Sequence, residues 1–344
     1  MYNILIKTLV GFIFVCTTAV NAVRADDSIV PFEGFHSPPE IMKILEESDI
    51  SYNIGELTDS LKYLSVREKP ALNNNYYRET DENGDIYLRD YQVSDSSVEL
   101  LNAGDMMFAS KKYDSALVLY KQALTADSNF FWVLTVIGHA FYYLGEYDSS
   151  RYYYEEAIRN NFVDYNAHWF LADLLWKMGD TARTVREITT AHLMNVNHLN
   201  IKLRLEDLRV ALTSPWQNWS FEPLYHVSDN KNKVNIIVDV DWIPYALVKA
   251  VWKYEPGYCK GITGGDYVEG QPYIREEIEA LNAWFIFKET SPDKLFYKVD
   301  EILEAGYLNS FIYYEMIAPY FPRLLLLLPD KEFNRLIEYL NRFH

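Results

Sequence analysis

The feature that most constrains this chain is a period of 34 residues that runs from Ser97 to His198 without a gap. Three columns of matching residues recur at this interval: Gly104, Gly138 and Ala172; Tyr113, Tyr147 and Thr181; and Ala123, Ala157 and Ala191. Such a period is typical of repeat architectures, in which each unit covers the apolar face of the unit before it. The sequence therefore predicts a solenoid over about a third of the chain.

Within each unit, small and bulky residues follow one another in a fixed order. At unit positions 4, 7, 8, 11, 20, 24 and 27, the first unit has Leu100, Ala103, Gly104, Met107, Ala116, Tyr120 and Ala123; the second has Leu134, Ile137, Gly138, Phe141, Ser150, Tyr154 and Ala157; the third has His168, Leu171, Ala172, Leu175, Thr184, Ile188 and Ala191. This order resembles the tetratricopeptide repeat (TPR), and the chain resembles exported bacterial members of that superfamily. The resemblance implies three hairpins of antiparallel helices, although Ser128, Phe162 and Val196 replace the usual inter-repeat proline.

An apolar stripe after the third unit predicts one more helix. Ile201, Leu205, Leu208 and Leu212 share one helical face, so this segment is expected to cap a solenoid that spans residues 97–213. The expected fold class is mainly α: an α-solenoid of three helical hairpins with a capping helix, followed by a mostly helical domain.

The segment before the repeats, residues 26–96, is expected to be a lead-in of short elements. Helical spacing predicts short helices around residues 41–45 and over 54–64. The pair Asn83–Gly84 lies between two tyrosine-rich runs, which predicts a β-hairpin near residues 76–91.

Residues 214–344 show no period and are expected to form a mainly helical C-terminal domain. Alternating valines predict one strand or hairpin near residue 236. Asp241 is expected to cap the helix that follows, with Pro244 in its first turn. Apolar spacing then predicts four further helical stretches, at residues 274–285, 291–306, 308–317 and 333–340.

The first 25 residues are typical of a signal peptide. Lys7 precedes an apolar run, Thr8 to Val20, that is too short to span a bilayer. The sequence thus predicts export, to the periplasm or as a secreted protein, with no membrane span after cleavage. The alternative is a lipoprotein anchored through Cys16, which is disfavoured because bulky residues, not a small one, precede this cysteine.

Charge narrows the class of partner. The chain has 49 acidic against 32 basic residues, and removal of residues 1–25, which contain two basic and no acidic residues, makes the balance more negative still. Since phosphate binding needs a clustered Lys and Arg surface, a nucleic-acid partner is not expected.

A run of leucines at 324–328 is broken by nearby prolines and is expected to be a buried helical turn.

The resemblance also implies where a partner binds. In TPR proteins the ligand normally lies along the concave face formed by the first helix of each unit. Mapped onto this sequence, the partner-binding groove is lined by Leu101, Asp105, Phe108, Trp132, Thr135, His139, Tyr142, Tyr143, Asn166, Trp169, Asp173, Trp176 and Lys177. Five of these are Trp or Tyr, which bury a large area on binding at small entropic cost. Two states stay open: a groove free for a partner, or one filled by another part of the chain.

One familiar ligand class is disfavoured, since the positions that grip acidic chaperone tails in other family members carry no cation here. The leading hypothesis is a non-catalytic interaction or scaffold protein of the cell envelope that binds a peptide or protein, without cofactor or metal. Two alternatives remain. One is a hydrolase or transferase in residues 214–344, with Asp239, Asp241 or Glu269 as its acids. The other is a structural subunit of an envelope complex whose groove is filled internally.

Overall fold

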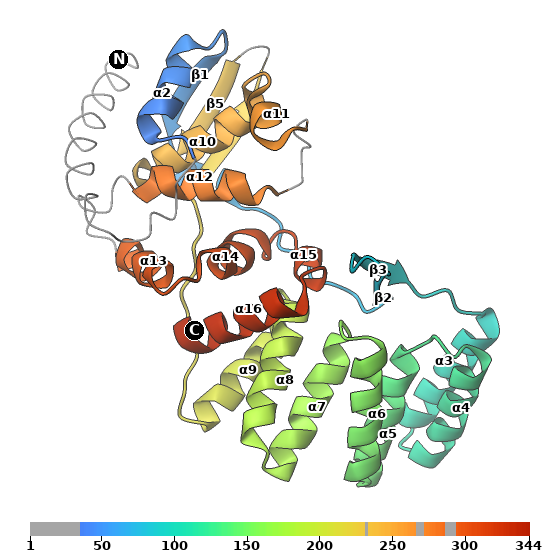
Figure 1. The fold of residues 1–344 in the computed structure, drawn as a ribbon. Coiled ribbons are helices and arrows are strands. Elements are labelled where there is room, and N and C mark those ends of the chain that lie inside the picture. Colours follow the sequence, from blue (N-terminus) through green and yellow to red (C-terminus); the bar gives the residue numbers. More distant parts are fainter. Residues whose placement is uncertain (1–34, 231–232, 266–271, 286–293) are drawn as a thin grey trace. The chain divides into compact units, whose positions relative to one another are not determined.

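The computed structural model describes residues 35–230, 233–265, 272–285 and 294–344 (Figure 1). Packing divides the chain into two compact units, and neither is a continuous segment. The first unit contains the residues up to Glu68 together with Ser220–Met316, and the second contains Lys69–Trp219 together with Ile317–His344. This division differs from the contiguous domains predicted from the sequence, because strand pairing and helix packing join distant segments in both units.

The second unit is built around the three predicted helical hairpins. Its helices are α3 (Asp95–Ala109), α4 (Tyr113–Ala126), α5 (Trp132–Leu144), α6 (Tyr147–Asn160), α7 (Tyr165–Met178) and α8 (Thr181–Met194). Each helix packs on the next in chain order, as Figure 1 shows in green. The capping helix α9 (Leu199–Ala211) packs on α8. The predicted solenoid of three helical hairpins with a capping helix is therefore confirmed.

Glycine is required where the two helices of a hairpin meet around a tyrosine. A Cβ atom at Gly104 would lie 2.4 Å from Cε1 of Tyr120, and a Cβ atom at Gly138 would lie 2.7 Å from Cδ1 of Tyr154. The third repeat has Ala172 and Ile188 at the equivalent positions, and both are fully buried. The column of small residues in the sequence thus follows the size of the side chain at position 24.

Two segments outside the repeats complete the second unit. Strands β2 (Tyr76–Thr80) and β3 (Ile86–Asp90) form the predicted hairpin, whose turn is closed by Oδ1 of Asp81, which accepts the N–H groups of Asn83 and Asp85. Helices α15 (Arg323–Leu326) and α16 (Asp330–Phe343) both pack on α8. Leu325 and Leu326 are buried, so the leucine run is a buried helical turn as predicted.

The first unit is a small mixed sheet covered by helices. Its elements are α2 (Pro38–Glu47), β1 (Ser51–Glu56), a 3₁₀ turn (Asp59–Ser65), β4 (Tyr225–Asp229), β5 (Lys233–Val238), a second 3₁₀ turn (Val240–Trp242), α10 (Ile243–Tyr254), α11 (Tyr258–Thr263), α12 (Ile274–Trp284), α13 (Lys294–Glu304) and α14 (Leu308–Phe311), which continues into a π-helical turn (Ile312–Ile317). The sheet order is β1-β5-β4, with β1 parallel and β4 antiparallel to β5. Helix α10 packs on β5 and on α12.

Two local predictions in this unit are wrong. The helix predicted over residues 54–64 begins as strand β1, because its backbone pairs with β5 from much later in the chain. Asp241 does not cap α10: the carboxylate of Asp239 instead accepts the N–H of Asp241 and caps the short 3₁₀ turn before the helix. The strand near 236 and the helices over 274–285, 308–317 and 333–340 agree with the prediction, whereas the start of the stretch at 291 lies outside the described residues.

Over the ranges described, the chain contains no helix that is both long enough and apolar enough to cross a bilayer.

Candidate binding groove

Three aromatic rings form a stacked column across the face of the first helices. The imidazole ring of His139 on α5 lies between the rings of Phe108 on α3 and Phe170 on α7. The centroid distances are 5.3 and 4.3 Å, and the interplanar angles are 24° and 26°. The three residues occupy positions 12, 9 and 6 of successive units, so the column shifts by about one helical turn per unit. It therefore crosses the helices obliquely and links all three units.

Beside this column lies a pocket of about 510 Å³, lined by His139, Tyr142, Tyr143, Tyr154, Phe170, Asp173, Trp176, Lys177 and Arg204. Its walls come from α5, α6, α7 and the capping helix α9. The volume falls within the range of known ligand pockets, and mostly aromatic walls with a few polar groups are typical of such sites. The pocket lies wholly within the second unit.

The charged groups of the pocket differ in how they are paired. Nε of Arg204 donates a hydrogen bond of 2.6 Å to Oδ1 of Asp173. Burial raises the pKa of the Asp173 carboxyl, while the Arg204 guanidinium opposes that shift. Nζ of Lys177 instead lies 5.3 Å from the ring centroid of Tyr142 and 4.9 Å from that of Tyr147. A hydrogen bond with Tyr147 raises the pKa of Lys177 further above neutral pH, and the charged ammonium can attract a carboxylate.

His139 contributes an uncharged ring to the groove. Its Nδ1 atom lies 3.1 Å from the hydroxyl oxygen of Tyr154, which is completely buried. Burial lowers the pKa of His139 to about 4, so the imidazole is neutral at physiological pH. The column thus presents a continuous aromatic surface without a charge in its middle.

The structure brings together some of the predicted groove residues and separates others. His139, Tyr142, Tyr143, Asp173, Trp176 and Lys177 line the pocket, and Phe108 belongs to the column. Asp105 is exposed and lies in the first repeat, outside the pocket, where it accepts a hydrogen bond of 2.7 Å from Tyr120.

Two predicted residues do not reach the groove surface, because other parts of the second unit cover them. Leu101 lies in the core between the first two repeats. Thr135 is completely buried, and its hydroxyl donates a hydrogen bond of 2.6 Å to the buried carboxylate of Asp164. The remaining three predicted residues are half-buried. Trp132 packs on the core of the first two repeats, and Trp169 packs on Phe170 and His198. Asn166 lies at the first turn of α7.

Three pocket residues were not among the predicted groove residues: Tyr154, Phe170 and Arg204. Continuing the 34-residue period by one unit would have found Arg204, since counting from Leu199 places it at position 6, the same position as Phe170 in the third unit. Each then faces position 9 of the preceding unit, as Phe170 stacks on His139 and Arg204 pairs with Asp173. The capping helix therefore acts as the first helix of a fourth unit.

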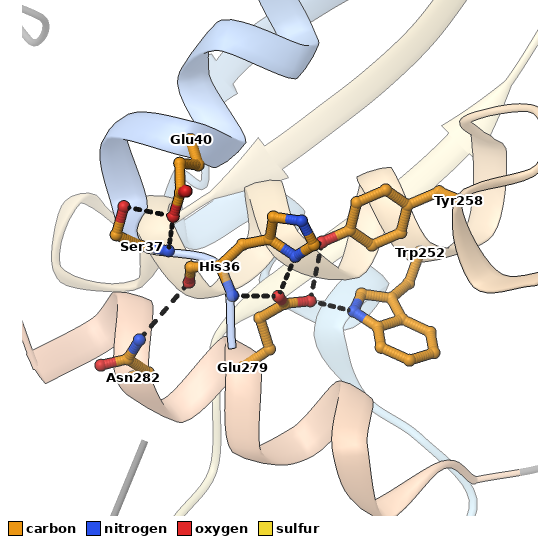
Figure 2. A network of polar contacts seen from close by, with 7 residues as sticks. All are labelled: His36, Ser37, Glu40, Trp252, Tyr258, Glu279 and Asn282. Atoms are coloured by element: carbon orange, nitrogen blue, oxygen red, sulfur yellow. Dashed lines mark hydrogen bonds and ion pairs between the residues drawn. The ribbon is translucent and has the colours of Figure 1, made fainter. Parts of the chain in front are cut away.

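The first unit holds a different polar arrangement, drawn in Figure 2 around Glu279 of α12. One carboxylate oxygen accepts the backbone N–H of His36 and lies 2.8 Å from its Nδ1. The other accepts hydrogen bonds of 2.6 Å from the indole of Trp252 and 2.9 Å from the hydroxyl of Tyr258. Since both oxygens are saturated and the side chain is 1% exposed, Glu279 holds the N-terminal end of α2 against α10, α11 and α12.

A second buried cluster lies nearby on the same helices. The ammonium group of Lys249 on α10 lies 2.5 Å from Glu276 and 2.8 Å from Glu277, and Tyr245 donates a hydrogen bond of 2.6 Å to Glu277. These acids are occupied by packing partners. Of the acids considered for catalysis, Asp239 is a turn cap beside Asp241, and Glu269 lies outside the described residues. Within the ranges that the structure covers, no cluster of three His, Cys, Asp or Glu side chains could hold a metal ion.

No protein-family profile matches the chain, and no curated protein matches it. Among solved structures, the chain is similar to TPR domains. The first TPR domain of Spaghetti (RPAP3), bound to an HSP90 peptide, is 18% identical over 36% of this chain and 98% of its own, with a TM-score of 0.33. The Sgt2 TPR domain from Aspergillus fumigatus is 20% identical over 35% and 82%, with a TM-score of 0.34. The Yersinia enterocolitica type III secretion chaperone SycD, in complex with a peptide of the translocator YopD, is 17% identical over 35% and 96%, with a TM-score of 0.32. At these values the likeness concerns the fold of the repeats alone.

Proposed function

We propose that this protein is a non-catalytic binding or scaffold protein that holds a peptide or protein segment in the groove of α3, α5 and α7. The observation that carries the proposal is the aromatic column with its adjoining pocket. Tyr143, at 52% exposed, packs edge-on against Phe108 and His139 at that column. Exposed aromatic surface next to a pocket is typical of protein interaction sites.

The chemistry of the pocket suggests what part of a partner enters it. Tyr142, Phe170 and Trp176 offer apolar surface to an aliphatic or aromatic side chain. Lys177 supplies a positive charge at the rim, whereas Arg204 is already paired with Asp173. A partner segment with an apolar residue next to an acidic one therefore suits this pocket.

The proposal can be tested with two tyrosines of the same unit. A photo-crosslinkable residue replaces Tyr143 on the first helix or, as the matched control, Tyr152 on the second helix, which is 57% exposed. We expect crosslinking in the native compartment to capture a partner from position 143 and not from position 152. Equal capture from both positions would contradict binding in the groove, and a crosslink within the same chain would mean that the groove is filled internally.

Variants of the pocket then test its contribution. With the captured partner in hand, Trp176→Ala and Lys177→Met should each weaken binding about tenfold or more, the size typical of hot-spot residues. Tyr152→Ala should leave the affinity unchanged, and circular dichroism should show an unchanged helix content in all three variants. Full affinity in both pocket variants would refute the assignment of this pocket.

We further propose that the protein is exported. The support is the sequence of residues 1–25, with its basic start, apolar run and small residues before Asp26. Mass spectrometry of the N-terminal peptide from native material should find a chain that begins near Asp26. An intact Met1 peptide in the cytosolic fraction would contradict this.

A further inference from the structure

A second feature repeats with the same period but lies at the far ends of the second helices. Position 31 of the three units carries Asp127, Asn161 and Asn195, immediately before the positions where the usual proline is missing. All three side chains bind the segment that precedes the repeats. This segment therefore runs along the edge of the solenoid, from the third unit to the first.

The contacts are made mainly to the main chain of that segment. The side-chain amide of Asn195 accepts the N–H of Leu72 at 2.9 Å and donates to its carbonyl at 2.8 Å. The amide of Asn161 donates to the carbonyl of Tyr76 at 3.1 Å and accepts the N–H of Arg78 at 3.3 Å. Both asparagines are buried, at 0% and 1% exposed. The second and third repeats thus each bind one peptide N–H and one peptide C=O group through an asparagine at the same position.

Further contacts lie within the row and at both of its ends. Asn197 donates a hydrogen bond of 2.8 Å to the carbonyl of Pro70, and Asn74 donates one of 2.9 Å to the buried carboxylate of Asp164. At the first repeat, the carboxylate of Asp127 accepts hydrogen bonds from the N–H and the hydroxyl of Ser94 at 2.8 and 2.7 Å. One side chain of the segment is deeply anchored, since Tyr76 is 1% exposed and lies under the guanidinium of Arg323.

We propose that this row is a binding track for an extended peptide segment, and that residues 70–78 of the same chain occupy it. The recognition of peptide N–H and C=O groups depends little on side chains, so the track fits an extended chain that supplies one aromatic anchor. The track is separate from the pocket between α5 and α7, and its proposal does not depend on the groove function.

Two observations indicate that the occupant can leave independently of the helices. Residues 71–75 include no helix or strand of their own, and β2 pairs with β3 alone in a two-stranded sheet. A two-stranded hairpin is at best marginally stable without other support. The helices, in contrast, bury apolar clusters along the repeats. An emptied track leaves the side-chain amides of Asn161 and Asn195 without the main-chain partners that residues 72–78 supply, which favours its refilling by another chain.

The test uses the full chain with Pro70–Arg78 replaced by a Gly/Ser linker of equal length. The probe is a fluorescein-labelled synthetic peptide with the sequence of residues 69–80. We expect the linker variant to bind this peptide about tenfold or more tightly than the wild-type chain does, because the track is vacant. Adding Asn161→Ala and Asn195→Ala to the linker variant should abolish the binding, and a peptide with Tyr76→Ala should bind weakly. A folded linker variant that binds no better than the wild type overturns the proposal.

A second measurement decides the matter if the linker variant does not fold. Hydrogen exchange on the wild-type chain compares the amides of Leu72 and Arg78 with those in the middle of α5 and α7. Exchange about tenfold or more faster at Leu72 and Arg78 supports a segment that opens without the helices. Exchange at the same rate as the helices would show that the segment leaves only on unfolding, and would overturn the proposal.

Discussion

The fit between Gly138 and Tyr154 makes a quantitative test of how the repeats pack. In Gly138→Ala the new methyl group would lie 2.7 and 2.8 Å from two ring carbons of Tyr154 and 3.2 Å from the carbonyl oxygen of Ser150. The ring cannot swing aside, because Tyr154 is completely buried and its hydroxyl contacts His139. Overpacking of this kind costs about 1–3 kcal/mol, and immobile neighbours place this site at the upper end of that range. The higher helix propensity of alanine returns about 1 kcal/mol, so a net loss of about 2 kcal/mol is expected.

The third unit indicates the compensating change. Its Ala172 and Ile188 occupy the same two positions, so Gly138→Ala combined with Tyr154→Ile rebuilds a pair that the chain already uses. Tyr154→Ile alone should cost about 2–4 kcal/mol, through the cavity and the lost contact with His139. In that background the alanine no longer meets a ring and should be neutral or stabilising by up to about 1 kcal/mol. The two substitutions should therefore be coupled by about 2–3 kcal/mol.

Native-state hydrogen exchange at the amides of α5 and α6 measures the opening free energy of the repeats within the full chain. The four proteins of the cycle are the wild type, the two single variants and the double variant. If Gly138→Ala costs the same with tyrosine and with isoleucine at position 154, within about 0.5 kcal/mol, the argument from close approach is refuted.

Three further predictions concern other parts of the chain, with the same exchange measurement as readout. Gly145 has a φ of 80° and no atom that an added Cβ would meet, so Gly145→Ala should cost about 1 kcal/mol from backbone conformation alone, and no loss would contradict this. Glu279→Gln replaces one of the two accepting carboxylate oxygens by an N–H donor and should destabilise the first unit by about 3 kcal/mol, whereas the exposed Glu304→Gln should stay within about 0.5 kcal/mol. Burial lowers the pKa of His192 from 6.5 to about 3, so the unfolded chain binds more protons between these values and stability falls as pH drops. From pH 7 to 5 this residue should account for about 2 kcal/mol of the loss, and a pH dependence unchanged in His192→Gln would refute its role.

The repeats could be predicted because their contacts are made between neighbours in the sequence. The size of residue 138 and that of residue 154 are set within one hairpin, and the next hairpin repeats the rule, so three copies report the same packing. The hairpin near residues 76–91 was equally accessible, since Asn83–Gly84 determines its turn locally. Arg204 was within reach as well, had the period been continued into the capping helix.

The parts that could not be predicted depend on contacts across long stretches of chain. Strand β1 alternates only over Ser51–Ile54, which is too short to identify a strand, and its partner β5 is 182 residues away, as the contact between Asn53 and Asn235 shows. Thr135 lies on the predicted face of α5, but its environment is determined by Asp164 and by Asn74 from the segment before the repeats. A repeat position identifies the direction of a side chain and leaves open what another segment places over it.

The division of the chain into two discontinuous units has a consequence for the order in which they can form. The chain passes from one unit to the other three times, near residues 68, 219 and 316. A ribosome delivers β1 first, then every helix of the repeats, and only afterwards the strand β5 that pairs with β1. Since an unpaired strand is a template for wrong pairing, the newly made chain must keep β1 out of other sheets until synthesis passes residue 238. Helix α16 arrives last and adds the final contacts to α8, so the solenoid starts early and is completed late.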